Sequence, residues 1–325
     1  MIKVSLLQDK KFRTMNRRNF MTKTTTLAGV GLIASIDDLT QKYPLNFEPT
    51  VGFSLKIFAT SWGYGGNIDS FCEKVKKEGY EGIEVWWDTT KKGQDELFSA
   101  LKKHQLEVGF LVGGSEKEVA KHFETFKKNL SEATSQTIQK PTYINCHSGK
   151  DFFTYEENKA FIDVTTETHK KTGIPIYHET HRGRMLFAAH ITRNFIDKNP
   201  DLRLTLDISH WTNVHESLLE NQTEAVQVAL ERTGHIHTRI GHEEGPQVND
   251  PRAPEWANAV KAHLGWWDKV VEMKMKAGQP LTMLTEFGPP NYLPTLPYTN
   301  LPVANQWEIN VYMMNFLKAR YTIKK

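Results

Sequence analysis

The chain has 325 residues, of which 39% are apolar and 24% are charged, and this globular composition excludes an intrinsically disordered protein. Its two cysteines, Cys72 and Cys146, are too few for a disulfide scaffold and form no CxxC pair, so a thiolate zinc site is also excluded. The formal net charge of +3 is mildly basic. The sequence has no run of about 18 apolar residues, so a membrane-spanning helix is not expected.

The first 35 residues carry the basic excess. They contain seven Lys and Arg residues and a single acid, Asp9, so the remaining 290 residues have 34 basic against 37 acidic side chains and a net charge of −3. The pair Arg17-Arg18 precedes a short, moderately apolar stretch that ends in small residues, an order typical of an export signal. The segment resembles a twin-arginine signal, which delivers folded proteins to the twin-arginine translocase. We therefore expect residues 1–35 to be a leader and the protein to be periplasmic or otherwise extracytoplasmic.

Two features depart from that signal pattern and leave an alternative open. Lys23 lies one position later than the usual lysine, and no clean A-x-A cleavage site is present. The alternative is a basic tail on a cytoplasmic enzyme. Met15 is an alternative start to Met1.

Residues 36–50 form a polar linker that contains proline, and a regular alternation begins at Val51. Short β-branched or aromatic runs predict strands at 52–59, 82–87, 106–112, 141–147, 174–179, 202–208, 235–240 and 281–286. Amphipathic segments between them predict helices at 67–78, 94–104, 116–138, 156–171, 185–198, 216–232, 255–277 and 303–318. Eight β-then-α units in about 270 residues favour a single-domain (β/α)8 TIM barrel over residues 51–325.

A doubly wound parallel sheet is the alternative fold. It normally carries a glycine-rich phosphate turn after its first strand, and Gly63-Tyr64-Gly65-Gly66 is a poor match to G-x-G-x-x-G. The barrel is therefore preferred, and in a barrel the active site lies at the carboxyl ends of the strands.

Four successive predicted strands carry an acid or an imidazole at their ends. These residues are Glu179, Asp207, the pair His235 and His237, and Glu286. Three carboxylates in one barrel mouth would repel one another unless a cation lay between them. An oxygen-rich set with one imidazole suits Mn²⁺, Mg²⁺ or Co²⁺, with Zn²⁺ as a further candidate, so we expect one divalent metal ion.

Other polar and aromatic residues also follow predicted strands. His147 could bond a substrate hydroxyl or assist an elimination, or it could simply pack. His181, Arg182 and Arg184 come from the loop after the fifth strand, where arginines suit carboxylates or phosphates but could equally pair with acids of the protein. Trp86 could stack on a sugar ring or pack beneath the helices. We include all five among the candidate substrate-binding residues.

Two residues on the strands themselves are expected to face the barrel interior. His235 lies two residues before His237, so their side chains share a face and one of them is expected to be deeper and structural. Glu84 on the second predicted strand is expected to point inward.

The chain resembles the xylose-isomerase-like barrel superfamily, which includes sugar isomerases, ketose 3-epimerases, inosose dehydratases and endonuclease IV. The resemblance covers most of residues 51–320 and is most specific at LTLDISHW (204–211), GHIHTRIGHEEGPQVNDPRAPEW (234–256) and LTEFG (284–288). Its epimerase branch implies that one divalent metal is bound by Glu179, Asp207, His237 and Glu286. It further implies that Glu179 and Glu286 are the catalytic acid–base pair and that His210 acts with them by contacting the substrate.

The sequence departs from the epimerase pattern after the seventh predicted strand. Those enzymes resemble H-x-G-E-x-N-R there, whereas Thr238 and Arg239 follow His237 in this chain. Glu243 stands where the substrate arginine is expected. Arg239 and Arg252 are the alternatives for that contact, and Arg252 is included among the candidate substrate-binding residues.

The resemblance implies an isomerase or epimerase that acts on a small (keto-)sugar through an enediolate intermediate. The main alternative is a lyase or dehydratase that performs β-elimination on a keto-sugar or 3-keto-glycoside, which export favours because such a substrate is an unphosphorylated extracytoplasmic carbohydrate. An endonuclease IV-like phosphodiesterase is disfavoured, because the domain's charge of −3 gives no basic face and predicts no nucleic-acid partner. A catalytically inactive sugar-binding barrel is disfavoured by the complete four-residue ligand set. A homo-oligomer is an open expectation.

Overall fold

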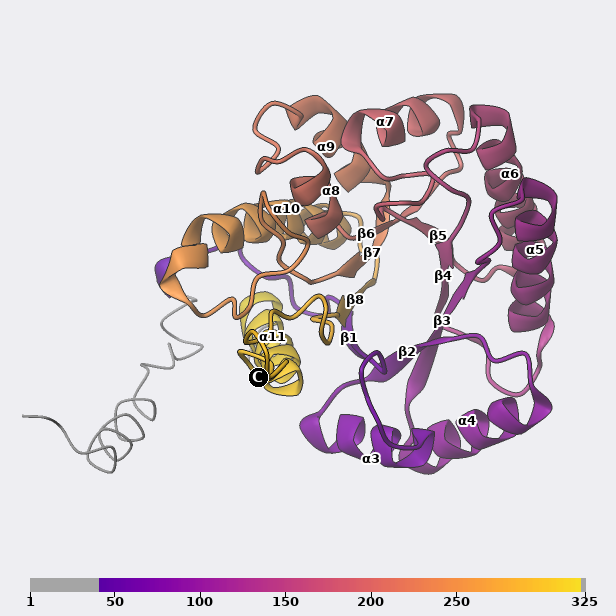
Figure 1. Cartoon of the computed structure of the whole chain (residues 1–325), viewed down its shortest axis with the longest axis horizontal. Coiled ribbons are helices and arrows are strands. Elements are labelled where there is room, and N and C mark those ends of the chain that lie inside the picture. The colour runs from indigo at the N-terminus through magenta and orange to yellow at the C-terminus, as the bar shows by residue number, and fades with distance from the viewer. Residues whose placement is uncertain (1–40, 323–325) are drawn as a thin grey trace, which may run out of the picture.

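The computed structural model describes residues 41–322, which form a closed barrel of eight parallel strands with helices around it (Figure 1). Each strand pairs with the next and β1 pairs with β8, so the sheet has no free edge. The predicted (β/α)8 barrel is confirmed. Its strands are β1 (Leu55–Thr60), β2 (Gly82–Trp86), β3 (Glu107–Gly113), β4 (Tyr143–His147), β5 (Ile176–Glu179), β6 (Leu204–Leu206), β7 (Thr233–His237) and β8 (Leu281–Thr285).

The helices follow the predicted order with one difference after β6. The helix predicted over 216–232 begins only at Thr223, as α9, and a short additional helix, α8, precedes it at Ser209–Val214. Glu216 and Leu219 adopt positive φ angles of 46° and 61°, which a continuous right-handed helix does not contain. The helices are α3 (Ile68–Glu78), α4 (Lys91–His104), α5 (Val119–Ser135), α6 (Tyr155–Thr172), α7 (Ala189–Lys198), α8 (Ser209–Val214), α9 (Thr223–Arg232), α10 (Ala257–Lys276) and α11 (Gln306–Tyr321).

Local sequence signals set the bounds of α6, the helix that precedes β5. The Thr154 hydroxyl accepts a bond from the Glu157 amide at 3.3 Å, and the Glu157 carboxylate accepts one from the Thr154 amide at 2.8 Å. This reciprocal cap satisfies two free amides at the helix start. Gly173 ends the helix in the left-handed region at φ 66°, which glycine adopts without a Cβ penalty. The chain thereby turns directly into β5 and positions the end of that strand.

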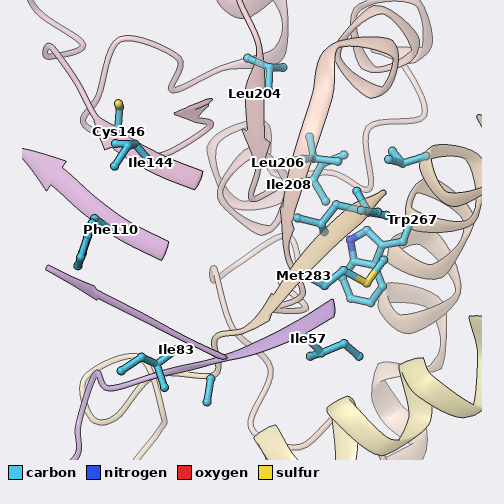
Figure 2. Packing of buried hydrophobic residues seen from close by; sticks show 14 of the residues in the cluster. Ile57, Ile83, Phe110, Ile144, Cys146, Leu204, Leu206, Ile208, Trp267 and Met283 are labelled. Carbon is cyan, nitrogen blue, oxygen red and sulfur yellow. The ribbon is translucent and has the colours of Figure 1, made fainter. Parts of the chain in front are cut away.

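The main core lies between the barrel and its ring of helices. Figure 2 shows strand residues such as Ile57 of β1, Ile144 of β4 and Met283 of β8 together with Trp267 of α10. Each of these side chains is fully buried. Burial of one such side chain contributes about 1.5–3 kcal/mol, and this layer holds the barrel in its closed form.

A second apolar cluster fills the barrel interior below the polar strand ends, formed by Phe58, Tyr143 and Leu284 with Tyr177 packed against them. Glycines on other strands of the barrel leave space for the tyrosine rings of this cluster. A Cβ atom at Gly109 would lie 2.4 Å from the Tyr143 ring, and one at Gly234 would lie 2.2 Å from the Tyr177 ring. The two glycines therefore make room inside the barrel for these aromatic rings.

Part of the predicted linker 36–50 packs on the barrel. Tyr43 and Phe47 lie against the main core, and the Tyr43 hydroxyl donates to the Ala257 carbonyl oxygen at 3.2 Å. The leader 1–35 lies outside the described residues, so the twin-arginine signal, the translocase and the site of action stay predictions. Within the described part of the chain, no helix combines the length and apolarity needed to cross a membrane.

Candidate active site

The carboxyl ends of the strands bring together the polar residues expected from the sequence. Glu179 is the last residue of β5 and His237 the last of β7, while Asp207 and Glu286 directly follow β6 and β8. All four strands run in the same direction, so these residues reach one level of the barrel. Glu84 of β2 joins them, buried as expected.

Two of the predicted metal ligands, Glu179 and Glu286, approach the ring of a third, His237. Its Nδ1 atom lies 3.0 Å from Glu286 Oε2 and 3.8 Å from Glu179 Oε2. One ligand atom each from Glu179, Asp207 and His237 lie within 4.8 Å of one another. Three of the predicted ligands, Glu179, Asp207 and His237, therefore lie close enough to share one ion, and Glu286 lies beside His237.

Two further groups of possible ligands overlap this one. Glu84, His235 and His237 form the first, and His147, Glu179 and His181 form the second. His235 lies deeper, stacked on Tyr143 with ring centroids 4.1 Å apart and with its Nδ1 3.0 Å from the Thr282 carbonyl oxygen. These contacts give His235 a structural role.

Arg239 is a fully buried cation within this group of acids. Its guanidinium donates to Asp207 Oδ2, and its Nη1 lies 3.4 Å from Glu286 Oε2. The same side chain donates to Ser209 Oγ at 3.2 Å and to His210 Nε2 at 2.8 Å. Arg239 thus pairs with two of the four predicted ligands, and of the two arginines considered for the substrate contact it is the one that reaches the site.

The pKa values at the site follow from the balance between burial and charge. Burial opposes protonation of His237, but the carboxylates of Glu286, Glu179 and Glu84 outweigh it and raise the pKa of that imidazole well above its usual value. Burial likewise opposes ionisation of Glu179, yet the charges of His147 and His237 hold its pKa well below the usual value. The carboxylates of the site therefore stabilise a positive charge on His237.

The pKa of Asp207 is shifted in the opposite direction from that of Glu179. Burial, only partly offset by Arg239, raises the pKa of this carboxyl to about 7. The nearby Glu286 and Glu179 carboxylates act in the same direction as burial, while His237 acts against it. A further cation next to Asp207 would favour its ionised form.

The donor set fits a divalent cation. Four carboxylates (Glu84, Glu179, Asp207 and Glu286) lie in this group, and Arg239 is a permanent cation that pairs with only two of them, Asp207 and Glu286. Glu179 Oε1 and Glu84 Oε2 are buried and have no hydrogen-bond partner within residues 41–322. Buried carboxylate oxygens without partners are costly, and a hard divalent ion satisfies them.

A cavity of about 320 Å³ opens above these residues. Its lining includes predicted residues Trp86, His147, His181, Arg184 and Glu286. Trp62, Tyr292, Glu84 and Arg239 also line it. A cavity of this size lies at the lower end of small-molecule sites and is suited to a single sugar ring.

Six predicted residues do not line the cavity, and three of them, Glu179, Asp207 and His237, belong to the group of possible ligands described above. The other three are Arg252, Arg182 and His210. Arg252 binds Asp250 within its own loop, with Nη2 2.6 Å from the carboxylate. Arg182 donates to Asn213 Oδ1 at 3.1 Å. His210 is fully buried next to His181, with ring centroids 3.8 Å apart, and it accepts the bond from Arg239.

Sequence reasoning missed two residues of the site, Asn145 and Tyr292. Asn145 donates to Glu179 Oε2 at 2.7 Å and lies two residues before His147 on β4, so the strand's alternation could have identified it. Tyr292 contacts Trp62 edge to face at 4.8 Å and lies beneath the Arg239 guanidinium at 4.8 Å. The five prolines of loop 287–302, which follows the last strand, favour a rigid cover over the barrel mouth or a contact between subunits, but no local pattern singles out Tyr292.

Comparison with known proteins shows which fold the chain shares. No protein-family model matches the chain, and no curated protein matches it. The structure of a 3-keto-D-glucoside 4-epimerase from E. coli, YcjR, aligns over 82% of this chain and 100% of its own, with a TM-score of 0.56 and 14% sequence identity. A D-tagatose 3-epimerase-like protein aligns over 82% and 98% of the two chains, with a TM-score of 0.52 and 13% identity.

A probable 3-DHS dehydratase from Bacillus anthracis, AsbF, aligns over 80% of this chain and 98% of its own, with a TM-score of 0.51 and 13% identity. At these identities the likeness establishes a common (β/α)8 barrel. The same barrel is therefore found in proteins described as sugar epimerases and as a dehydratase.

Proposed function

We propose that the protein is a divalent-metal-dependent isomerase or epimerase that acts on a small (keto-)sugar through an enediolate intermediate. The observation that carries this proposal is the approach of two carboxylates, Glu179 and Glu286, to the same nitrogen of His237 beneath the cavity. The sugar epimerases that share the barrel support a substrate of this class.

The proposed metal ligands are Glu179, Asp207, His237 and Glu286, with Mn²⁺, Mg²⁺ or Co²⁺ as the preferred ion and Zn²⁺ as a further candidate. Such an ion, when bound, would polarise a substrate carbonyl and its adjacent hydroxyl and make the neighbouring C–H more acidic. The protein's own carboxylates would then accept and return the proton.

The surroundings of the two glutamates suit these acid–base roles. Glu179 Oε2 is held by Asn145 at 2.7 Å and by His147 Nε2 at 2.8 Å, and its low pKa keeps it ionised as a proton acceptor at neutral pH. Glu286 is fixed by His237 and Arg239, and it lines the cavity directly. One carboxylate removing a proton and the other returning it would give epimerisation or isomerisation.

The aromatic wall of the cavity supports a carbohydrate. Trp62, Trp86 and Tyr292 all line it, and both tryptophans keep a large exposed surface. Aromatic faces pack on the C–H faces of sugar rings, while the polar cavity floor meets hydroxyls. The fit of this cavity to one sugar ring is our reason for proposing a small carbohydrate and no nucleic acid as the partner.

A lyase is the second candidate, and the position of His147 favours it. This imidazole lines the cavity with its Nε2 2.8 Å from Glu179 Oε2, so it can pass a proton to a leaving hydroxyl after Glu179 accepts one from carbon. β-Elimination from a keto-sugar or 3-keto-glycoside needs this combination. The dehydratase with the same barrel supports this alternative.

Metal analysis of the purified protein tests the ligand set. We expect about one divalent ion per chain, and Glu179→Gln or Asp207→Asn should lose it because a charged ligand becomes a weaker neutral one. The control is Asp163→Asn, which removes an exposed carboxylate paired with Lys159 on α6. Unchanged metal content in both site variants would show that the ion, if any, binds elsewhere.

The reaction itself is tested with a panel of free ketoses and 3-keto-glycosides in deuterium oxide, with products identified by NMR. An epimerase or isomerase incorporates solvent deuterium at the carbon next to the carbonyl, whereas a lyase releases the leaving group and yields an unsaturated ketone. Glu286→Gln should abolish either outcome. Turnover without deuterium in recovered substrate or product would contradict the enediolate mechanism.

We also propose export by the twin-arginine translocase, which rests on the leader sequence around Arg17 and Arg18. Replacing both residues with lysine should leave the precursor in the cytoplasm, as cell fractionation would show. Equal export of the variant and the unaltered chain would overturn this assignment and favour the cytoplasmic alternative.

A further inference from the structure

Arg184 is a cavity-lining arginine that has no acidic partner. It lies in the loop after β5 and is half-buried, and its Nη1 donates to the Gly114 carbonyl oxygen at 3.3 Å. No carboxylate within residues 41–322 comes within 4.0 Å of its guanidinium. Arg239, the other arginine of the cavity, contrasts with it because Asp207 and Glu286 already neutralise that side chain.

Arg184 has a second cation, Lys150, in its surroundings, and the carboxylates that act on the two lie beyond ion-pair distance of Arg184. Burial lowers the pKa of Lys150, and repulsion from Arg184 lowers it further. Burial also lowers the pKa of Arg184 itself, with only longer-range compensation from Glu179 and Asp151. An anion placed against Arg184 would offset the burial of its guanidinium.

We propose that Arg184 binds a carboxylate of the substrate and that the substrate is therefore an acidic (keto-)sugar. This inference rests on the proposed function, since it names the substrate of the same cavity. The guanidinium offers two parallel N–H groups, the geometry that recognises a carboxylate. Arg184 and Glu286 line one cavity of about 320 Å³, so one sugar ring can place its carboxylate at Arg184 and its reacting carbons towards Glu286.

The charge balance favours a carboxylate over a phosphate. Arg184 is the one cavity-lining Lys or Arg in the described part of the chain that no carboxylate neutralises, and it supplies a single positive charge. A phosphate dianion normally draws several charged or backbone donors. One free guanidinium matches a monoanion.

Calorimetric titration of the Mn²⁺-loaded protein with three probes tests the proposal. These are D-glucuronate, its uncharged methyl ester and glucose 6-phosphate. We expect the carboxylate to bind about tenfold or more tightly than the ester, the difference that a charge-assisted hydrogen bond provides, and the phosphate to bind more weakly than the carboxylate.

Variants then assign that preference to one side chain. Arg184→Gln should remove the difference in affinity between D-glucuronate and its methyl ester while leaving the affinity for the ester unchanged. Arg184→Lys should keep part of that difference. Arg203→Gln is the matched control, because Arg203 lies just before β6, away from this cavity. Equal binding of acid and ester, no binding of either, tighter binding of the phosphate, or a Gln variant that weakens acid and ester alike would overturn the proposal.

Failure of this proposal and failure of the proposed function are distinguishable. Ligand binding is measured without turnover, whereas the proposed function is tested by metal content and deuterium incorporation. A preference for the acid that depends on Arg184 would stand even if no exchange were found. Deuterium incorporation with neutral ketoses, together with equal binding of the acid and the ester, would refute only the proposal that the substrate is an acidic sugar.

Discussion

Arg239 brings one permanent positive charge into a barrel mouth that holds four carboxylates. It contacts Asp207 and Glu286 directly, and it has almost no exposed surface. Removing one partner of such a pair leaves the other charge buried without compensation, which costs more than the pair itself contributes. The guanidinium therefore stabilises the arrangement of acids on which the proposed metal site depends.

Replacing Arg239 with methionine should lower the free energy of unfolding by about 3–5 kcal/mol at pH 7. Urea denaturation measures this. At pH 5 the loss should be smaller, because Asp207, with a pKa of about 7, is then protonated even beside its arginine, so the unaltered protein no longer has that ion pair to lose. Arg203→Met is the control, since Arg203 is exposed and bonds only main-chain carbonyls, and its change should stay within about 0.5 kcal/mol. Equal losses at both pH values would contradict the charge argument.

The sequence predicted which residues lie at the strand ends more readily than it predicted which side chains contact one another. Glu179, Asp207, His237 and Glu286 end successive strands, and the structure brings them together. The loop arginines could not be sorted in the same way, because the sequence does not show which acids each guanidinium reaches in the fold. Asp250 lies two residues from Arg252 and binds it, while Arg184 has no such neighbour.

At the scale of elements, the loop after β8 determines the shape of the cavity mouth. Gly288 follows Glu286 by two residues, and its amide donates to Gln247 Oε1 at 2.7 Å. A Cβ atom at Gly288 would lie 2.3 Å from the Trp62 ring. The glycine thereby allows Trp62 to pack against Tyr292 at the cavity edge.

Gly288→Ala should displace Trp62 and weaken ligand binding, at a cost in stability of about 1–3 kcal/mol from overpacking. A shift of tryptophan fluorescence and a higher KM with little change in kcat would report this. Gly265→Ala in α10 is the matched control, because no atom lies within 4 Å of the added methyl group. That variant should gain about 0.5–1 kcal/mol from helix propensity. If Gly288→Ala left both fluorescence and KM unchanged, Trp62 would not depend on the glycine.

Over the whole molecule, neutral histidines hold elements together away from the cavity. The His263 ring of α10 donates from Nδ1 to the Ala259 carbonyl oxygen at 2.8 Å and accepts at Nε2 from the Gly241 amide at 3.2 Å. Burial lowers the pKa of His263 to about 4. His178 likewise bonds Ser148 and Thr165 on its two nitrogens, and burial lowers its pKa to about 3.

These histidines predict a loss of stability in mild acid. Because the folded pKa of His263 lies below the unfolded value of about 6.5, the unfolded chain binds more protons between these values, and stability falls as the pH falls. The decrease is about 1.4 kcal/mol per pH unit for each such histidine within its window. Urea denaturation between pH 7 and pH 4.5 should show it, and His263→Gln should have a shallower decrease. Parallel curves for the variant and the unaltered chain would exclude this role of His263.

The sequence by itself determined the barrel and the ring of acids at its mouth, because both follow from local periodicity. Alternating strands and helices define the closed sheet, and a strand's last residues lie at its carboxyl end wherever the loops go. Only the tertiary structure decided that Arg239 pairs with Asp207 and Glu286, that Tyr292 returns to the cavity, and that Arg184 rather than Arg252 lines it. Those positions depend on loop paths and on contacts between residues far apart in the chain, which no local pattern encodes.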